Sequence, residues 1–142
     1  MNIEAPSAII WAILVDIGQY TQWNPFLHDV AGRVAPGAQI HFQIMLAGNI
    51  SFPAQAQITR VVVSRELRWG GKLLWPWLLR AEHYHTLEPI SAARTRVRHG
   101  ETFSGLIPLL LGPLIRVWAQ RKYDAVSIAL RRRAESSTAQ EV

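Results

Sequence analysis

Three histidines and one glutamate stand at alternate positions in two neighbouring segments of the chain. His83 and His85 are two residues apart, and so are His99 and Glu101. Side chains two residues apart in a strand point to the same face of a sheet. If both segments are strands, antiparallel pairing sets His85 opposite Val97 or His99. We therefore expect three imidazoles and a carboxylate to meet on one face. Three apolar residues at matching positions indicate that this face points inward: Leu87, Val97 and Phe103.

Three kinds of site are compatible with these groups. Imidazoles and a carboxylate are ligands that suit zinc or iron. A histidine with a pKa near neutrality can also act as a general acid or base. Alternatively, the groups pair with one another or with solvent at a cavity mouth, because buried polar groups need partners. We favour this last interpretation and assign no metal and no cofactor. If the site is catalytic, the candidates are His85, His99 and Glu101.

Aromatic side chains are the expected walls of a cavity beside this cluster. Ligand pockets combine such residues with a few polar groups that orient the ligand. We expect a ligand to be bound by these walls together with His83, His85, His99 and Glu101. The walls are Trp23, Phe42, Trp69, Phe103, Trp118 and Tyr123. A separate apolar loop, Trp75–Trp77, is a candidate lid or dimer contact.

The positions of these residues depend on a sheet and a helix that the sequence pattern predicts. Alternation of apolar and polar residues predicts an antiparallel sheet with one covered face. The predicted strands are Phe26–Val34, Ala38–Ala47, Phe52–Val63, Glu66–Leu73, Arg80–Glu88 and Arg94–Gly105. Before them, a helix is predicted at Ser7–Asp16 and a short helical turn at Tyr20–Trp23.

The pattern becomes helical from about Pro108 to Ala134. Apolar residues recur there at spacings of three and four, which gives one apolar stripe: Ile115, Ala119, Tyr123, Val126 and Leu130. Gly112 and Pro113 should break or kink this helix early. A sheet face and a helix stripe bury each other, so the predicted fold class is α+β, in one domain over residues 1–135. Residues 136–142 are polar, and we expect a disordered tail.

The chain resembles the START-like superfamily, also called SRPBCC or polyketide cyclase/dehydrase-like, from about Ile3 to Glu135. The stretches that carry the resemblance are Ile3–Ser7, Ile10–Trp11, Asp16–Tyr20, Trp23–Phe26, Leu87–Pro89, Thr95, His99–Gly105 and Leu130–Glu135. The resemblance implies a helix-grip fold. In that fold, a curved antiparallel sheet of about seven strands wraps around a long C-terminal helix, with two small helices after the first strand. Because only four residues precede Ala5, the first strand should be short.

The same resemblance implies a hydrophobic ligand in a cavity between the sheet and the helix. Such a ligand would be a lipid, an aromatic polyketide or an isoprenoid-like molecule. Two alternatives stay open. The chain is then either a cyclase or dehydratase that uses the cavity histidines and glutamate as acid and base, or a protein-interaction module that acts through the Trp75–Trp77 loop.

Composition and charge narrow the range of partners. The 142 residues contain no cysteine, which excludes disulfides and thiolate chemistry and fits a cytoplasmic location. The net charge is +5. Basic residues at the end of the last helix interact favourably with the helix dipole, which explains them without a nucleic-acid partner. In addition, no aromatic residue stands among Arg131–Arg133 to stack on a base. We therefore expect no nucleic acid. A homodimer is compatible with the sequence, whereas contact with a membrane surface is the less favoured expectation.

Overall fold

The computed structural model describes residues 1–46, 50–73 and 79–140, except for the side chains of residues 72, 73, 79, 111, 114–119 and 140. The loop Trp75–Trp77 lies outside this range. The elements in chain order are β1 (Asn2–Ile3), α1 (Ser7–Val15), a 3-10 turn η1 (Ile17–Gln19), α2 (Tyr20–Trp23), β2 (Leu27–Gly32), β3 (Gln39–Met45), β4 (Ser51–Val62), β5 (Glu66–Leu73), β6 (Leu79–Ser91), β7 (Arg94–Ser104) and α3 (Leu106–Gln140).

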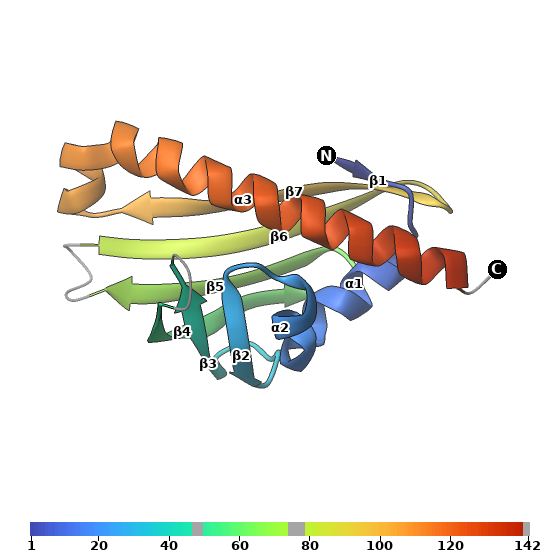
Figure 1. Ribbon diagram of the computed structural model, residues 1–142, viewed down its shortest axis with the longest axis horizontal. Helices are drawn as coiled ribbons and strands as arrows, with labels where there is room; N and C mark the ends of the chain where they lie inside the picture. The colour runs from blue at the N-terminus through green and yellow to red at the C-terminus, as the bar shows by residue number, and fades with distance from the viewer. Residues whose placement is uncertain (47–49, 74–78, 141–142) are drawn as a thin grey trace.

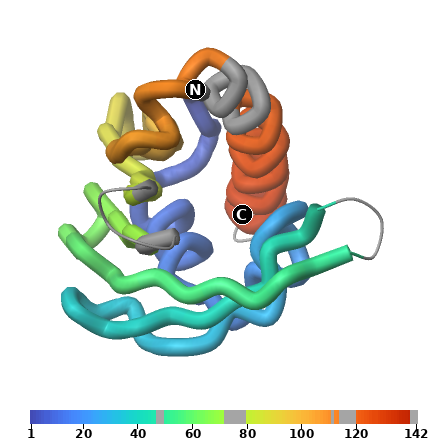
Figure 2. The backbone as a smooth tube through the Cα atoms, turned by 90° about the vertical axis from the view of Figure 1, so that its left-hand side faces the viewer, coloured from blue at the N-terminus to red at the C-terminus, as the bar shows by residue number. Residues whose placement is uncertain are grey.

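The seven strands form one antiparallel sheet in the order β1-β7-β6-β5-β4-β3-β2. The sheet curves, and α3 lies across its inner side (Figures 1 and 2). The short helices α1 and α2 connect β1 with β2, the two outer strands of the sheet. This arrangement confirms the predicted α+β helix-grip fold. The first strand is two residues long, as its position near residue 1 led us to expect.

Alternating side chains explain which face of the sheet carries α3. In β3, Ile40 and Phe42 are buried, whereas His41 between them is exposed. In β4, Ala56 and Ile58 are buried and Gln57 is exposed. Alternate residues along each strand therefore point to opposite faces of the sheet. One face is apolar and packs inward, and the other is polar and faces water.

Among the described residues, the inner side is filled completely where α1 meets the C-terminal half of α3. Ile10 and Leu14 of α1, Leu67 of β5, and Leu130 and Ala134 of α3 all have no exposed surface. They belong to one hydrophobic cluster, which anchors the C-terminal half of α3 to the sheet.

The helix α3 is longer than the sequence indicated. It was expected to span Pro108–Ala134, and it spans Leu106–Gln140. Residues 136–140, expected to be disordered, continue the helix; the hydroxyls of Ser136 and Ser137 donate hydrogen bonds to the carbonyl of Arg133. Pro113 lies inside the helix, and its first turns stand at an angle to the rest (Figure 1). Among the described residues, no helix has the length and hydrophobicity needed to span a bilayer.

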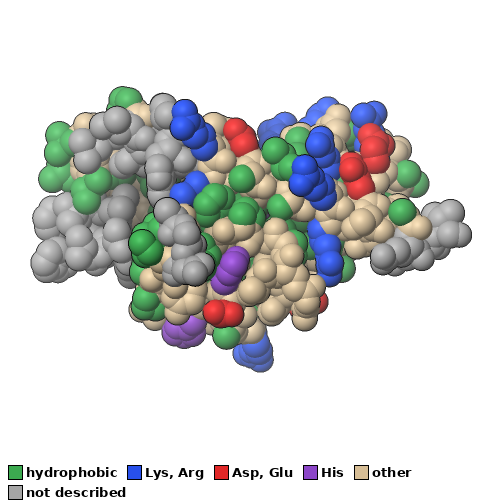
Figure 3. All heavy atoms as spheres, viewed as in Figure 1, with side chains coloured by type: hydrophobic (Ala, Val, Ile, Leu, Met, Phe, Trp, Pro, Cys, Tyr) green, Lys and Arg blue, Asp and Glu red, His purple; other side chains and the backbone are tan. Residues whose placement is uncertain are grey.

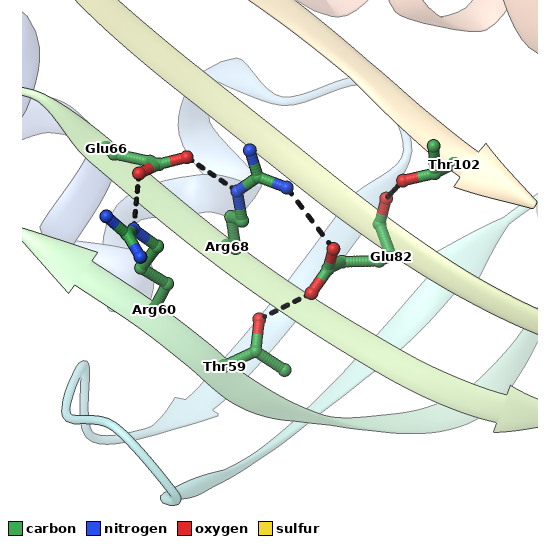
Figure 4. A network of polar contacts seen from close by, with 6 residues as sticks. All are labelled: Thr59, Arg60, Glu66, Arg68, Glu82 and Thr102. Atoms are coloured by element: carbon green, nitrogen blue, oxygen red, sulfur yellow. Dashed lines mark hydrogen bonds and ion pairs between the residues drawn. The ribbon is translucent and has the colours of Figure 1, made fainter.

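The outer face of the sheet carries a network of charged side chains (Figure 4). Glu66 accepts from Arg60 at 2.5 Å and from Arg68 at 2.6 Å. Glu82 accepts from Arg68 at 3.3 Å and from Thr59 at 2.9 Å. The two arginines hold the pKa of Glu66 below its usual value. Because each of these groups already has a protein partner, we assign the network a structural role.

Candidate functional site

A pocket of about 330 Å³ lies on the inner side of the sheet, beside the part of α3 that precedes the solid core. Aromatic side chains from several elements form most of its wall: Phe26, Phe42, Phe52, Trp69, Phe103 and Tyr123. On β4, Ala54 and Ala56 also line it. Their small side chains leave space that larger residues would fill, so the apolar alternation of β4 produces a hollow there rather than a packed core.

The polar end of the pocket contains Glu101 and Tyr123. The Tyr123 hydroxyl donates a hydrogen bond to Glu101 Oε2, which joins α3 to β7 across the pocket wall. Burial raises the pKa of Glu101 from its usual 4.5 to about 7. Near neutral pH this carboxyl group is therefore present both with and without its proton. Groups of this kind can either orient a polar ligand atom or exchange a proton with it.

The three histidines meet beside this end of the pocket. Strand pairing sets His85 opposite His99 and His83 opposite Glu101, which confirms the expected shared face. His83 Nε2 lies 2.9 Å from His99 Nε2, and the other ring nitrogen of His99 lies 3.0 Å from the Ser127 hydroxyl of α3. The rings of His85 and His99 are stacked, with centroids 4.2 Å apart.

All three imidazoles are held in the neutral form by their surroundings. Burial, with a smaller contribution from the neighbouring His99, lowers the pKa of His83 and His85 well below 6.5. Burial lowers the pKa of His99 to about 4. Trp69 adds to this apolar environment, because its ring stacks on His83 at 4.5 Å between centroids and lies 5.5 Å from His85.

His85 differs from its neighbours in having no polar partner for either ring nitrogen. It is 2% exposed, and both Nδ1 and Nε2 are buried without a hydrogen bond. The expected mutual pairing is thus found between His83 and His99 only, whereas Glu101 bonds to Tyr123.

The structure places the residues predicted from the sequence in three groups. The pocket lining includes Phe42, Trp69, His83, Glu101, Phe103 and Tyr123. His85 and His99 are absent from that lining and belong, with His83, to the histidine cluster. Trp23 lies outside the lining and packs edge-to-face on Tyr20 at 4.9 Å. The side chain of Trp118 lies outside the described residues.

Other lining residues were not expected. Lys122 lies over the Phe26 ring, 4.8 Å from its centroid, and burial lowers its pKa. Asn24 is buried and holds the chain before β2 by accepting hydrogen bonds from the backbone N–H groups of Phe26 and Leu27. No sequence pattern pointed to Lys122 or Asn24, because their places in the wall depend on how α3 and the chain before β2 pack against the sheet.

Comparisons with known proteins identify the fold. No family model matches the chain, and neither does any curated protein. The di-domain aromatase/cyclase StfQ of steffimycin biosynthesis superposes with a TM-score of 0.77 at 8% identity, over 98% of this chain and 50% of that one. The chain thus spans about half the length of that protein. A START superfamily protein from Mycobacterium smegmatis gives a TM-score of 0.73 at 17% identity, over 96% of this chain and 94% of that one.

A second aromatase/cyclase is also similar. Zhui from Streptomyces sp. R1128 superposes with a TM-score of 0.67 at 16% identity, over 95% of this chain and 90% of that one. Identities this low show a shared fold. The chain therefore has a START-like fold of the kind found in polyketide aromatase/cyclases and START proteins.

Proposed function

We propose that this protein binds an apolar small molecule in the pocket between the sheet and α3. The observation that carries the proposal is the pocket itself, about 330 Å³ with a largely aromatic wall and polar groups at one end. Its size falls within the range of small-molecule sites, roughly 300–1,000 Å³. Glu101, Tyr123 and Lys122 would orient a polar atom of the ligand, while Phe42 and Phe103 contact its apolar body.

The rim of the pocket supports an apolar ligand as well. Phe52 lines the pocket and is 39% exposed, so apolar surface continues from the wall to the outside. A separate apolar surface lies at the start of α3, where Leu109 and Leu110 are 79% and 70% exposed, and Leu109 lines a neighbouring pocket that shares Phe103 and Tyr123 with the first. Figure 3 shows hydrophobic side chains at this end of the molecule, on the left of the view. A lipid, an aromatic polyketide or an isoprenoid-like molecule has the apolar body that the aromatic wall would contact.

Ligand binding can be tested without knowing the natural ligand. Native mass spectrometry of the purified chain should show a co-purifying small molecule. In a thermal-shift screen of fatty acids, isoprenoid alcohols and polycyclic aromatic phenols, at least one should raise the melting temperature, because a ligand that binds only the folded state stabilises it. No bound molecule together with no shift by any of these probes would overturn the proposal.

A matched pair of variants connects the binding to this pocket. Ala54→Leu adds volume to the wall and should reduce or abolish the thermal shift and the co-purifying mass. Ala31→Leu makes the same change at an exposed position of β2 and should leave both unchanged. Equal effects of the two substitutions, or none from either, would show that the ligand binds elsewhere.

A second candidate function is acid–base catalysis of a cyclase or dehydratase kind. It is favoured by the position of Glu101 and Tyr123, a bonded carboxyl–phenol pair that lines the pocket. His99 and His85 lie behind this pair and would act through His83. Once a substrate is found, Glu101→Gln should abolish turnover and leave ligand affinity within a few fold. Turnover that survives this substitution would leave binding as the function. A protein-interaction role for Trp75–Trp77 has no such support, because that loop lies outside the described residues.

A further inference from the structure

We propose that His83, His85 and His99 form a binding site for one divalent transition-metal ion, for which zinc is the best match. The sequence alone led us to assign no metal, and the proposal follows from the arrangement of the rings. One nitrogen of each histidine lies within 4.8 Å of the others. Zinc sites with three histidines keep Zn–N distances near 2.0–2.1 Å, which places ligand nitrogens about 3.4 Å apart. To reach that geometry, the Nε2 atoms of His83 and His99, 2.9 Å apart, would separate slightly, and the wider separations within the cluster would shorten.

His85 supplies an independent reason to expect a ligand at this place. Its ring is 2% exposed, and neither nitrogen has a hydrogen-bond partner. A neutral imidazole always presents one N–H donor and one lone pair. Leaving both unsatisfied in the interior is unfavourable, and a buried polar group without a partner calls for a bound water or ion. A metal ion would take up the lone pair that the protein leaves unused.

The other two histidines are already oriented toward a common point. Ser127 of α3 holds His99 through Nδ1 at 3.0 Å, which leaves His99 Nε2 directed at His83 Nε2, 2.9 Å away. In the metal-free chain a proton must lie between these two nitrogens. A metal ion would take its place and accept both lone pairs, and the histidine that carried the proton on Nε2 would carry it on Nδ1 instead. Metal-ligating histidines commonly bond to a second group through their other nitrogen, and Ser127 is such a group here.

Binding requires a small rotation of the rings. His85 and His99 are now nearly parallel, with 8° between their planes and 4.2 Å between centroids. A metal lies in the plane of each ligand ring, so at least one ring must turn about its χ2 angle, which is a soft torsion in histidine. Trp69 covers His83 and His85 with an apolar surface. Such a cover excludes water and strengthens the interaction of the ion with its ligands.

Three protein ligands leave one position of a tetrahedral zinc ion for water or another molecule. His83 belongs both to the cluster and to the pocket lining, so the ion would lie at the pocket wall near Glu101. The proposal does not depend on the apolar ligand. Thermal shifts with apolar probes on chelator-treated protein test ligand binding in the pocket separately. The proposed ligand and the proposed metal site can therefore be disproved independently.

The test is a metal titration of the whole chain, produced with a tag that lacks histidine and stripped with a chelator. Equilibrium dialysis with elemental analysis should give one zinc per chain. Cobalt should give the intense visible bands of four-coordinate cobalt, because a six-coordinate ion absorbs only weakly. Ser127→Ala should weaken zinc binding by about 10-fold or more, since it removes the group that orients a ligand.

Single substitutions identify the ligands. His85→Gln should abolish the cobalt bands, and His83→Gln and His99→Gln should do the same. The matched control is His41→Gln, which changes an exposed histidine of β3 and should leave the bands intact. Circular dichroism identifies any of the three variants that fails to fold. The variants that do fold then show whether the histidines bind the ion.

Three results would overturn the proposal. The first is zinc uptake well below one ion per chain in the unmodified protein. The second is uptake that survives His85→Gln or is lost equally in His41→Gln. The third is a crystal structure of zinc-treated protein in which a water, without anomalous scattering, occupies the position beside His85.

Discussion

The Tyr123 hydroxyl of α3 donates a hydrogen bond to the Glu101 carboxylate of β7. The bond crosses the pocket wall and joins the two elements that enclose the pocket. Glu101 is largely buried, and its pKa is already raised to about 7 by that burial. The phenol is therefore an important stabilising partner of the ionised carboxylate.

Tyr123→Phe should lower the free energy of unfolding by about 1–3 kcal/mol at pH 8, because it leaves a buried carboxylate without its donor. It should also move the pKa of Glu101 further above about 7, since a bond to the ionised form is lost. Urea unfolding and NMR titration measure the two effects. Tyr84→Phe is the control, because the Tyr84 ring lies on the outer face beside Arg68. An equal loss in both variants would contradict the assigned role of Tyr123.

The metal-free protein should lose stability in mild acid. The pKa values of His83 and His85 lie well below 6.5 and that of His99 is about 4, so below pH 6.5 the unfolded chain binds protons that the folded chain does not. Unfolding free energy then falls as the pH falls. Glu101 acts oppositely between pH 7 and 4.5, because its pKa is raised in the folded state. Three histidines outweigh one glutamate. The free energy of unfolding falls by on the order of 1 kcal/mol per pH unit for each extra proton that the unfolded chain binds.

Denaturant unfolding at a series of pH values between 7 and 4.5 measures this dependence. Glu101→Gln removes the opposing group and should make the decline steeper. His41→Gln, which changes an exposed histidine of β3, is the matched control for the substitution itself. A flat profile over this range, or a rise in stability toward acid, would show that the three imidazoles are not held neutral by burial.

Asn24 should prove essential for the shape of one pocket wall. Its side-chain oxygen accepts from the N–H groups of Phe26 at 2.9 Å and Leu27 at 3.0 Å. Asn24→Ala leaves these donors unsatisfied and should cost about 1–3 kcal/mol of stability. Because Phe26 lines the pocket, the affinity for an apolar probe should fall too. Asn24→Asp keeps the acceptor and should recover most of the loss. If aspartate and alanine behave alike, the two hydrogen bonds are not what positions Phe26.

The sequence predicted the sheet, the long helix and the shared face of the histidine cluster. These features follow from periodicity, because alternation in a strand and spacing in a helix decide locally which side chains point the same way. His85 and His99 illustrate this point: period two and hairpin pairing suffice to set them opposite each other. The same local rules could not give the end of α3, which continues to Gln140 past the predicted limit.

Only the tertiary structure decided where the inner face is filled and where it is open. Leu130 packs solidly against the sheet, whereas Tyr123, two turns earlier, faces a pocket above Ala54. It also decided that Trp23 lies outside the lining of this pocket and that His85 has no polar partner. These outcomes depend on how segments far apart in the chain pack together. The packing of distant segments is set by the volumes of many side chains at once, and no periodic pattern in the sequence records it.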